Sequence, residues 1–273
     1  MDTPTISQKG LAYWKFGQGG PPVLLIMGFG MRGFAWDNQS SEISNHRTVA
    51  YYDHYGVGAS QPLPRKKNTM EDMANDALHI MDELGWDDAH IVGVSMGGMI
   101  AQHLTLMAKE RVRSLSLLAS SAGGLLQPKP KLKGVGCFLK ILSAKGPEQR
   151  VKAVQSLLFP KEYLQKITQE QHQAMSKVYG YSPDKVTMRA QLRAVMKHNT
   201  KAHLHQVEHA TLIMQPTQDL MIHPKNSDTL HKLIPNSTIL RFEDAGHGFI
   251  RQCKERINSA LLDHFAQVDG LAS

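Results

Sequence analysis

Residues 89 to 100 read Ala89-His90-Ile91-Val92-Gly93-Val94-Ser95-Met96-Gly97-Gly98-Met99-Ile100. An apolar run rich in β-branched residues ends within the segment Gly93 to Gly97, and an amphipathic helical pattern follows it. A strand, a sharp turn and a helix with a serine at the tip form the context that a G-x-S-x-G nucleophile elbow requires. Glycine suits the positions two before and two after Ser95, because a Cβ there would clash in the crowded turn. A plain glycine-rich turn is the alternative, so the other motifs of the chain have to decide.

The composition is that of an ordinary globular protein. The chain has 273 residues, 41% of them apolar and 20% charged, which suits one large α/β domain or a core with an inserted subdomain. Cys137 and Cys253 show no metal-ligand spacing and are interpreted as reduced thiols of a cytosolic protein. The first ten residues are polar, and the apolar stretches are far shorter than a membrane span. We therefore expect a soluble cytoplasmic protein without a signal peptide.

The net charge of +7 is unevenly distributed along the chain. Residues 121–202 hold 15 Lys and Arg against 4 Asp and Glu, a balance of +11, whereas the remaining residues balance at −4. A basic chain often binds nucleic acid, but these basic residues lie in one segment without a nucleic-acid-binding motif. We therefore expect no nucleic-acid partner.

Strand and helix patterns alternate along most of the chain. The expected strands are 5–17 (a strand or hairpin), 23–27, 47–53, 89–94, 112–119, 210–215 and 237–242. The expected helices are 70–84, 97–109, 224–233 and about 250–267. Thr69 and Asp72 have the spacing of a capping box at the start of the first of these helices. The alternation predicts an α/β fold with a mostly parallel sheet and helices on both faces.

Residues 121–202 interrupt this alternation. Their apolar positions recur at helical spacing, with Lys and Gln between them. We predict a core made of residues 1–120 and 203–273, with residues 121–202 inserted as a helical cap.

Three loops that follow strands carry the residue types of a serine nucleophile site. Ser95 follows the strand 89–94, Asp219 follows 210–215, and His247 follows 237–242 with a glycine on either side. A serine hydroxyl needs a general base, and the base needs a carboxylate that orients it. Asp244 is the alternative acid, but it lies three residues before His247 and suits a turn of its own loop. We predict Ser95, Asp219 and His247 as the catalytic residues.

A serine nucleophile also needs two donors for the oxyanion that forms. The backbone N–H of Met96, directly after Ser95, is the first candidate, and that of Phe29, in the loop after the strand 23–27, is the second. Phe29 is assigned by position alone, and a role of its side chain as a pocket wall fits the same place.

With these motifs the sequence resembles the α/β-hydrolase superfamily, in its capped branch of serine esterases, methylesterases and haloperoxidase-like enzymes. Residues 27–30, Met-Gly-Phe-Gly, stand where many members have His-Gly-x-Pro or His-Gly-x-Gly, and residues 53–60 resemble their D-x-R-G-x-G-x-S loop. The resemblance implies the α/β-hydrolase fold and the order Ser, Asp, His of the triad. Met27 replaces the usual His and Tyr55 the usual Arg, which leaves the shape of both loops open.

The resulting expectation is a hydrolase that cleaves a hydrophobic carboxylic ester through an acyl-enzyme intermediate. Thioester cleavage, C–C bond cleavage and a ligand-binding role on the same fold are the alternatives. We expect no cofactor and no metal ion, and the partner is a small-molecule ester. The sequence leaves the oligomeric state open.

Within the cap, residues 131–145 are the most informative. Val135, Phe138, Leu139, Ile141 and Leu142 lie close to one helical face, with lysines around them. A helix packed on the core with solvated lysines is the favoured interpretation. The alternatives are an apolar wall for an acyl chain and a basic lid that contacts anionic lipid transiently or meets a phosphorylated carrier, without stable membrane insertion.

Overall fold

A computed structural model describes residues 3–64, 68–125 and 127–271, except the side chains of Phe138 and Leu142. Its centre is an eight-stranded sheet in the order β1-β2-β4-β3-β5-β6-β7-β8. β1 and β2 run antiparallel to their neighbours, and the other strands pair in parallel, as predicted. The strands are β1 (Thr5–Ile6), β2 (Ala12–Phe16), β3 (Val23–Ile26), β4 (Val49–Tyr52), β5 (Ala89–Val94), β6 (Val112–Leu118), β7 (Thr211–Pro216) and β8 (Ser237–Phe242).

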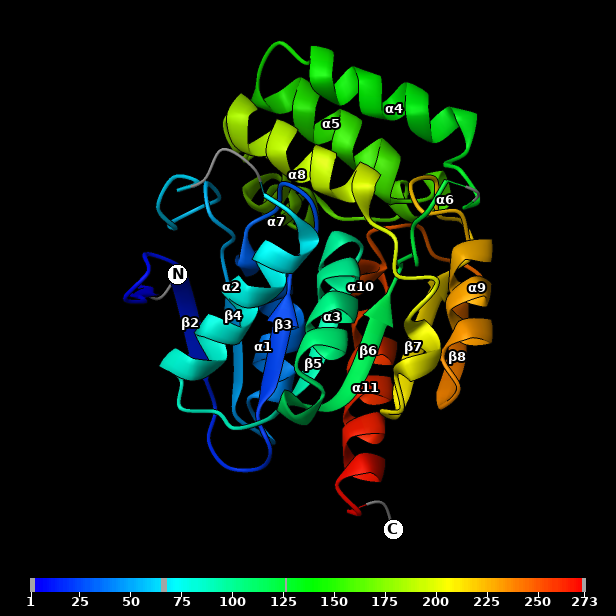
Figure 1. Cartoon of the computed structure of the whole chain (residues 1–273). Helices are drawn as coiled ribbons and strands as arrows, with labels where there is room; N and C mark the ends of the chain where they lie inside the picture. Colours follow the sequence, from blue (N-terminus) through cyan, green and yellow to red (C-terminus); the bar gives the residue numbers. More distant parts are fainter. Residues whose placement is uncertain (1–2, 65–67, 126, 272–273) are drawn as a thin grey trace.

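Helices cover both faces of this sheet (Figure 1). They are α1 (Asp37–Ile43), α2 (Met70–Glu83), α3 (Met96–Met107), α9 (Lys225–Leu233), α10 (Phe249–Gln252) and α11 (Lys254–Val268), with 3-10 turns at Gly33–Trp36, Lys109–Arg111 and Leu204–Gln206. Successive residues of β3 face opposite sides, because side chains alternate along a strand. Val23 and Leu25 pack in a cluster with α1 and α11, whereas Leu24 and Ile26 pack with α2 and α3. This double burial explains why β3 is apolar throughout.

The ends of two helices test the sequence patterns directly. At the start of α2, Thr69 Oγ1 accepts a hydrogen bond from the Asp72 N–H at 3.0 Å, and an Asp72 carboxylate oxygen accepts one from the Thr69 N–H at 2.8 Å. The predicted capping box is therefore confirmed. The prediction of one unbroken helix near 250–267 is wrong. The backbone of Cys253 (φ −117°, ψ 33°) leaves the helical conformation and separates α10 from α11.

Between β6 and β7 the chain forms a group of helices that lies above the carboxyl ends of the parallel strands (Figure 1). These are α4 (Leu132–Ser143), α5 (Pro147–Leu158), α6 (Lys161–Leu164), α7 (Gln169–Tyr179) and α8 (Lys185–Lys197). The two ends of the group run side by side, because the Thr200 N–H donates to the Ala122 carbonyl and the Gly124 N–H donates to that of His198, each at 2.9 Å. We call these helices the cap. Their division from the core at residues 121 and 202 stays a prediction.

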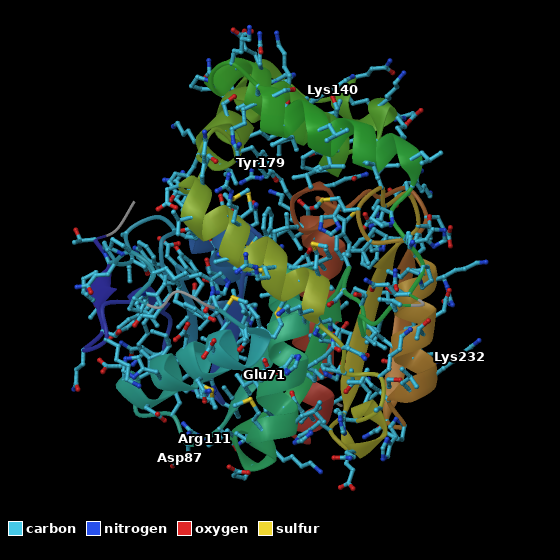
Figure 2. All side chains as sticks on the ribbon, turned by 45° about the horizontal axis from the view of Figure 1, so that its top comes forward. Glu71, Asp87, Arg111, Lys140, Tyr179 and Lys232 are labelled. Atoms are coloured by element: carbon cyan, nitrogen blue, oxygen red, sulfur yellow. The ribbon has the colours of Figure 1, made fainter. Side chains whose placement is uncertain are left out.

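The described apolar residues of helix α4 differ in exposure, although Ile141 lines the first of two cavities beneath the cap and Val135 the second. Cys137 and Ile141 are buried, whereas Leu132, Val135 and Leu139 are exposed. The lysines of α4 are exposed, and Figure 2 shows Lys140 on its outer side. The side chains of Phe138 and Leu142 lie outside the described part of the chain. Contact of this basic helix with anionic lipid stays a prediction.

Two further features of the described residues concern the cysteines and the helix lengths. Cys137 and Cys253 are both buried and free. Among the described residues, every helix is too short or too polar to cross a bilayer.

Candidate active site

Ser95 stands at the turn between β5 and α3 in a conformation that is rare for a side chain larger than glycine. Its φ is 56° and its ψ is −119°. A Cβ at Gly93 would lie 2.3 Å from the Gly97 carbonyl oxygen, and one at Gly97 would lie 2.0 Å from that of Ile26. Both distances are far below contact, so the two glycines are sterically required.

Neighbouring strands hold this strained turn in place. The Ser95 N–H donates to the Leu118 carbonyl at 2.8 Å, and the Ser120 hydroxyl donates to the Ser95 carbonyl at 3.0 Å. Such outside support is what allows a residue to remain at an unfavourable φ. The elbow is therefore a fixed element that presents the Ser95 side chain above the sheet.

His247 and Asp219 form a buried pair beside this elbow. Asp219 follows β7 and His247 follows β8, and the His247 Nδ1 lies 2.6 Å from the Asp219 Oδ2. The Asp219 Oδ1 accepts hydrogen bonds from the N–H groups of Met221 at 2.7 Å and Ile222 at 3.0 Å. Because an ionised carboxylate only accepts, the His247 Nδ1 carries the proton, which leaves Nε2 as an acceptor in the neutral ring.

Asp244, the alternative acid, pairs with Arg256 and not with His247. Its two carboxylate oxygens accept from the Arg256 guanidinium at 2.7 and 2.9 Å. This pairing lowers the pKa of the Asp244 carboxyl, and the ion pair is largely exposed. Of the two candidates, Asp219 is the one that contacts His247.

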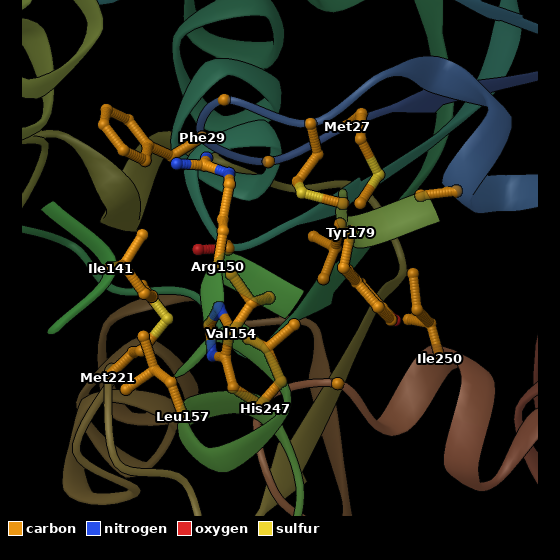
Figure 3. A pocket seen from close by; sticks show the side chains of 18 of the residues that line it. Met27, Phe29, Ile141, Arg150, Val154, Leu157, Tyr179, Met221, His247 and Ile250 are labelled. Carbon is orange, nitrogen blue, oxygen red and sulfur yellow. The ribbon is translucent and has the colours of Figure 1, made fainter. Parts of the chain in front are cut away.

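Ser95 and His247 line the same cavity beneath the cap (Figure 3). This first cavity has a volume of about 100 Å³, and its wall is mostly apolar. A second cavity of about 270 Å³ also reaches Ser95, and the two share Phe29 and Met221. Ser95 thus stands where two apolar spaces meet, which suits a substrate with a group on each side of the reacting bond.

The loop after β3 lies directly against the elbow. A Cβ at Gly28 would lie 3.3 Å from the Ser95 Cβ, and Phe29 is the next residue of this loop. Met96 is the first residue of α3, where backbone N–H groups have no partner within the helix and favour negative charge. The side chain of Phe29 lines both cavities, so its wall role and its predicted backbone role are compatible.

His54 compensates for the departure at Met27. Its Nε2 lies 2.9 Å from the Met27 carbonyl oxygen, which fixes the start of the loop that contains Phe29. Burial lowers the pKa of His54, so the ring is neutral and Nε2–H is the donor. The sequence analysis assigned no role to this residue, although it stands in the glycine-punctuated loop after β4.

The loop at residues 53–60 is held by Asp53 and Tyr55. The two Asp53 carboxylate oxygens accept from the N–H groups of Gly33 at 2.6 Å and Ala59 at 2.9 Å. Desolvation raises the pKa of this buried carboxyl, and these hydrogen bonds oppose that effect. The Tyr55 hydroxyl donates to the Lys9 carbonyl at 2.5 Å, so the replacement of Arg ties the loop to the N-terminal hairpin.

The cap contacts both loops through residues that the sequence analysis missed. The buried Gln191 of α8 accepts a hydrogen bond from the Gly30 N–H at 2.8 Å. The Tyr181 hydroxyl accepts one from the Gly58 N–H at 2.7 Å. These contacts span more than 100 residues of sequence, and no local pattern signals them.

Arg150 of α5 was also missed, and it lines the first cavity. A signal was present in the sequence, because Arg150 stands four residues before Val154 and seven before Leu157, on the apolar face of its helix. Tyr179 lines the same cavity, and its burial raises the pKa of its hydroxyl, so it stays protonated.

Comparison with known proteins agrees with this architecture. Residues 21–134 match the family model described as alpha/beta hydrolase fold. A putative carbamate hydrolase, RutD, from Azorhizobium caulinodans is 27% identical over 262 residues, which cover 94% of this chain and 96% of the relative. A protein of the same name from Caulobacter vibrioides is 29% identical over 248 residues, 88% of each chain.

Solved structures show the same fold at lower identity. The enol-lactonase from Burkholderia xenovorans superimposes with a TM-score of 0.81 at 21% identity and covers 94% of this chain and 96% of its own. A thermophilic esterase from Thermogutta terrifontis gives 0.79 at 23% identity and covers 97% of both chains. The chain therefore has the α/β-hydrolase fold, and its residues 21–134 resemble the family described by that fold.

Proposed function

We propose that the chain is a serine hydrolase that cleaves a carboxylic ester through an acyl-enzyme intermediate. One observation carries the proposal, namely the 2.6 Å contact of His247 with Asp219 in a site where His247 and Ser95 line one cavity. The names of the relatives, carbamate hydrolase, esterase and lactonase, support hydrolysis of an acyl bond in general. The mostly apolar cavity walls favour an ester with hydrophobic groups.

In the proposed first half-reaction, Ser95 Oγ attacks the acyl carbon while His247 Nε2 takes the hydroxyl proton. Asp219 holds the imidazole by its Nδ1–H and stabilises the imidazolium that forms. The backbone N–H groups of Met96 and Phe29 are proposed to bind the oxyanion of the tetrahedral intermediate. When the C–O bond breaks, His247 returns the proton to the leaving alcohol and Ser95 remains acylated.

In the second half-reaction, water replaces the alcohol. His247 Nε2 takes a proton from the water as its oxygen attacks the acyl carbon, and a second tetrahedral intermediate forms. The bond to Ser95 Oγ then breaks, the proton passes to that oxygen, and the carboxylic acid leaves. No redox step or external cofactor is needed for this sequence.

Carbamates are the second candidate substrates. The two sequence relatives described above carry the name putative carbamate hydrolase, and a carbamate presents the same type of carbonyl to Ser95. Thioesters and bonds between carbons stay open, because the same three side chains serve them.

A panel of nitrophenyl esters with acyl chains of increasing length, extended to a thioester and a nitrophenyl carbamate, tests the proposal. We expect turnover by the wild type and a loss of at least about 10⁴-fold for Ser95→Ala. Equal rates for the two proteins would overturn it. A binding protein on the hydrolase fold, the rival from another class, would bind such compounds without turnover and without covalent labelling.

A further inference from the structure

The first cavity contains a single strongly basic or acidic side chain. Arg150 lines it, and no other Lys, Arg, Asp or Glu does so among the residues that the structure describes. Apart from Ser95, His247 and Tyr179, the remaining wall consists of glycine, methionine, aliphatic residues and Phe29. In Figure 3 the Arg150 side chain extends among the lining side chains, and its guanidinium points toward Phe29.

One end of the Arg150 guanidinium is fixed and the other is available. Its Nε–H donates to the Tyr181 carbonyl at 3.2 Å, which sets the plane of the group. Within the described part of the chain this is the single hydrogen bond of the guanidinium, and no carboxylate pairs with it. The Nη groups therefore keep donors for a ligand, in the forked arrangement that matches a carboxylate.

The surroundings of Arg150 penalise a cation without a counter-ion. The residue is half-buried, and this desolvation lowers the pKa of its guanidinium, although the group stays charged at neutral pH. A charge that is removed from water without a partner destabilises the protein that holds it. An anionic group of a ligand would remove this penalty in the bound state.

We propose that Arg150 binds a carboxylate of the substrate, so that the enzyme selects esters or carbamates that carry a carboxylate near the scissile carbonyl. This inference rests on the proposed function, because Ser95 and His247 line the same cavity as Arg150. A carboxylate fits better than a phosphate, since one guanidinium neutralises one charge and the other walls are apolar. The cavity of about 100 Å³ is small for a ligand site, so the carboxylate stands on a short chain.

A purely structural role of Arg150 makes a different prediction. By joining α5 to the backbone of Tyr181, the side chain would support the cap for every substrate equally. Selection of a carboxylate instead affects charged substrates and spares neutral ones of the same shape. The comparison of matched charged and neutral esters therefore separates the two roles.

Two pairs of esters provide this comparison, one for each side of the scissile bond. Monomethyl succinate carries its carboxylate in the acyl part, and methyl 4-methylpentanoate is its neutral isostere. O-acetylglycolate carries the carboxylate in the alcohol part, and isobutyl acetate is its neutral isostere. Rates are measured by titration of the released acid at neutral pH for the wild type, Arg150→Gln, Arg150→Lys and Lys152→Gln. Lys152 is the matched control, since it lies on the same helix, is exposed and pairs with Glu148.

For at least one pair we expect the wild type to prefer the charged ester. Arg150→Gln should lower kcat/KM for that ester by about 10- to 100-fold, mainly through KM, and change the isostere by less than about threefold. For the charged ester, kcat/KM of Arg150→Lys should lie between those of the wild type and Arg150→Gln, because lysine keeps the positive charge but lacks the forked donors of the guanidinium. Lys152→Gln should keep the full preference. Equal losses for both members of a pair, or a wild-type preference for both isosteres, would overturn the assignment.

Binding to the Ser95→Ala protein separates this inference from the proposed function. Calorimetric titration with the same four esters should show tighter binding of the charged member, and the added Arg150→Gln change should remove the difference. If the wild type cleaves no ester but this binding difference persists, the proposed function fails and the assignment of Arg150 stands. If esters are cleaved and no difference is seen, the assignment of Arg150 fails and the proposed function stands.

Discussion

The core and the cap contribute different kinds of residues to the candidate active site and its supporting loops. The core supplies Ser95, Asp219 and His247, each from a loop directly after a strand, so the sheet sets their positions. The cap supplies Arg150 and Gln191, whose positions depend on side-chain contacts between segments far apart in sequence. The sheet thus positions the residues of the proposed chemistry, whereas the cap supports the loops through Gln191 and is proposed to select the substrate through Arg150.

The largest expected effect is on the core side and concerns the choice of the acid. Asp219→Asn should lower kcat by about 10⁴-fold, because an amide no longer holds the His247 tautomer that leaves Nε2 as the base. Asp244→Asn, the matched control, should change kcat by less than about threefold, since Asp244 contacts Arg256 on the surface. Steady-state kinetics on one nitrophenyl ester measures both variants. Similar losses for the two would mean that Asp219 has no special role.

Glycine substitutions compare the rigidity of the two regions. Gly97→Ala would place a Cβ 2.0 Å from the main-chain oxygen of Ile26, so we expect a loss of about 3 kcal/mol or more in unfolding free energy. Gly136→Ala in α4 meets no atom within 4 Å and should stabilise the protein by about 0.5–1 kcal/mol. Urea denaturation monitored by circular dichroism measures the unfolding free energy of both variants. Only a small loss of unfolding free energy in Gly97→Ala, or any loss in Gly136→Ala, would contradict the described packing.

The glycines of the elbow also show what the sequence could predict. The spacing of Gly93 and Gly97 around Ser95 is a local requirement of one turn, so a single sequence reveals it. The alternation of strands and helices likewise predicted the mostly parallel sheet. The contact of Gln191 could not be predicted, because its partner Gly30 lies more than 100 residues away in the sequence. For Arg150 the sequence shows a place on the apolar face of a helix, but not that this face lines a cavity with Ser95.

The hydrogen bond between cap and core at Gln191 should have a moderate effect on rate. Gln191→Met keeps the volume but leaves the Gly30 N–H without its acceptor, and the loop that carries Phe29 loses a support. We expect kcat to fall by about 10-fold with little change in KM, because the loss affects the proposed oxyanion donors more than substrate binding. Arg189→Gln on the exposed face of α8 is the control and should match the wild type. A Gln191→Met enzyme with unchanged kcat would remove the proposed role of this contact.

The last prediction concerns the pH dependence of stability at the junction of the two regions. His198 of the cap is buried against His103 of α3 and the Ser121 carbonyl, and burial, followed by the charge of His103, lowers its pKa to about 4. The unfolded chain binds a proton near pH 6.5 that the folded protein takes up only near pH 4, so this residue favours unfolding as the pH falls through that window. His198 contributes at most about 1.4 kcal/mol per pH unit to the slope of the unfolding free energy against pH. Urea unfolding across this range should show a flatter dependence for His198→Gln, and an unchanged slope would contradict the assignment.

The central claim is that Ser95 is the nucleophile, and covalent trapping tests it most directly. The wild type is incubated with a fluorophosphonate, and its intact mass and labelled peptide are determined by mass spectrometry. We predict one adduct per chain on Ser95, with no labelling of Ser95→Ala and labelling slowed at least about 10³-fold in Asp219→Asn. A wild-type protein that remains unlabelled, or one labelled at another residue, would contradict the account.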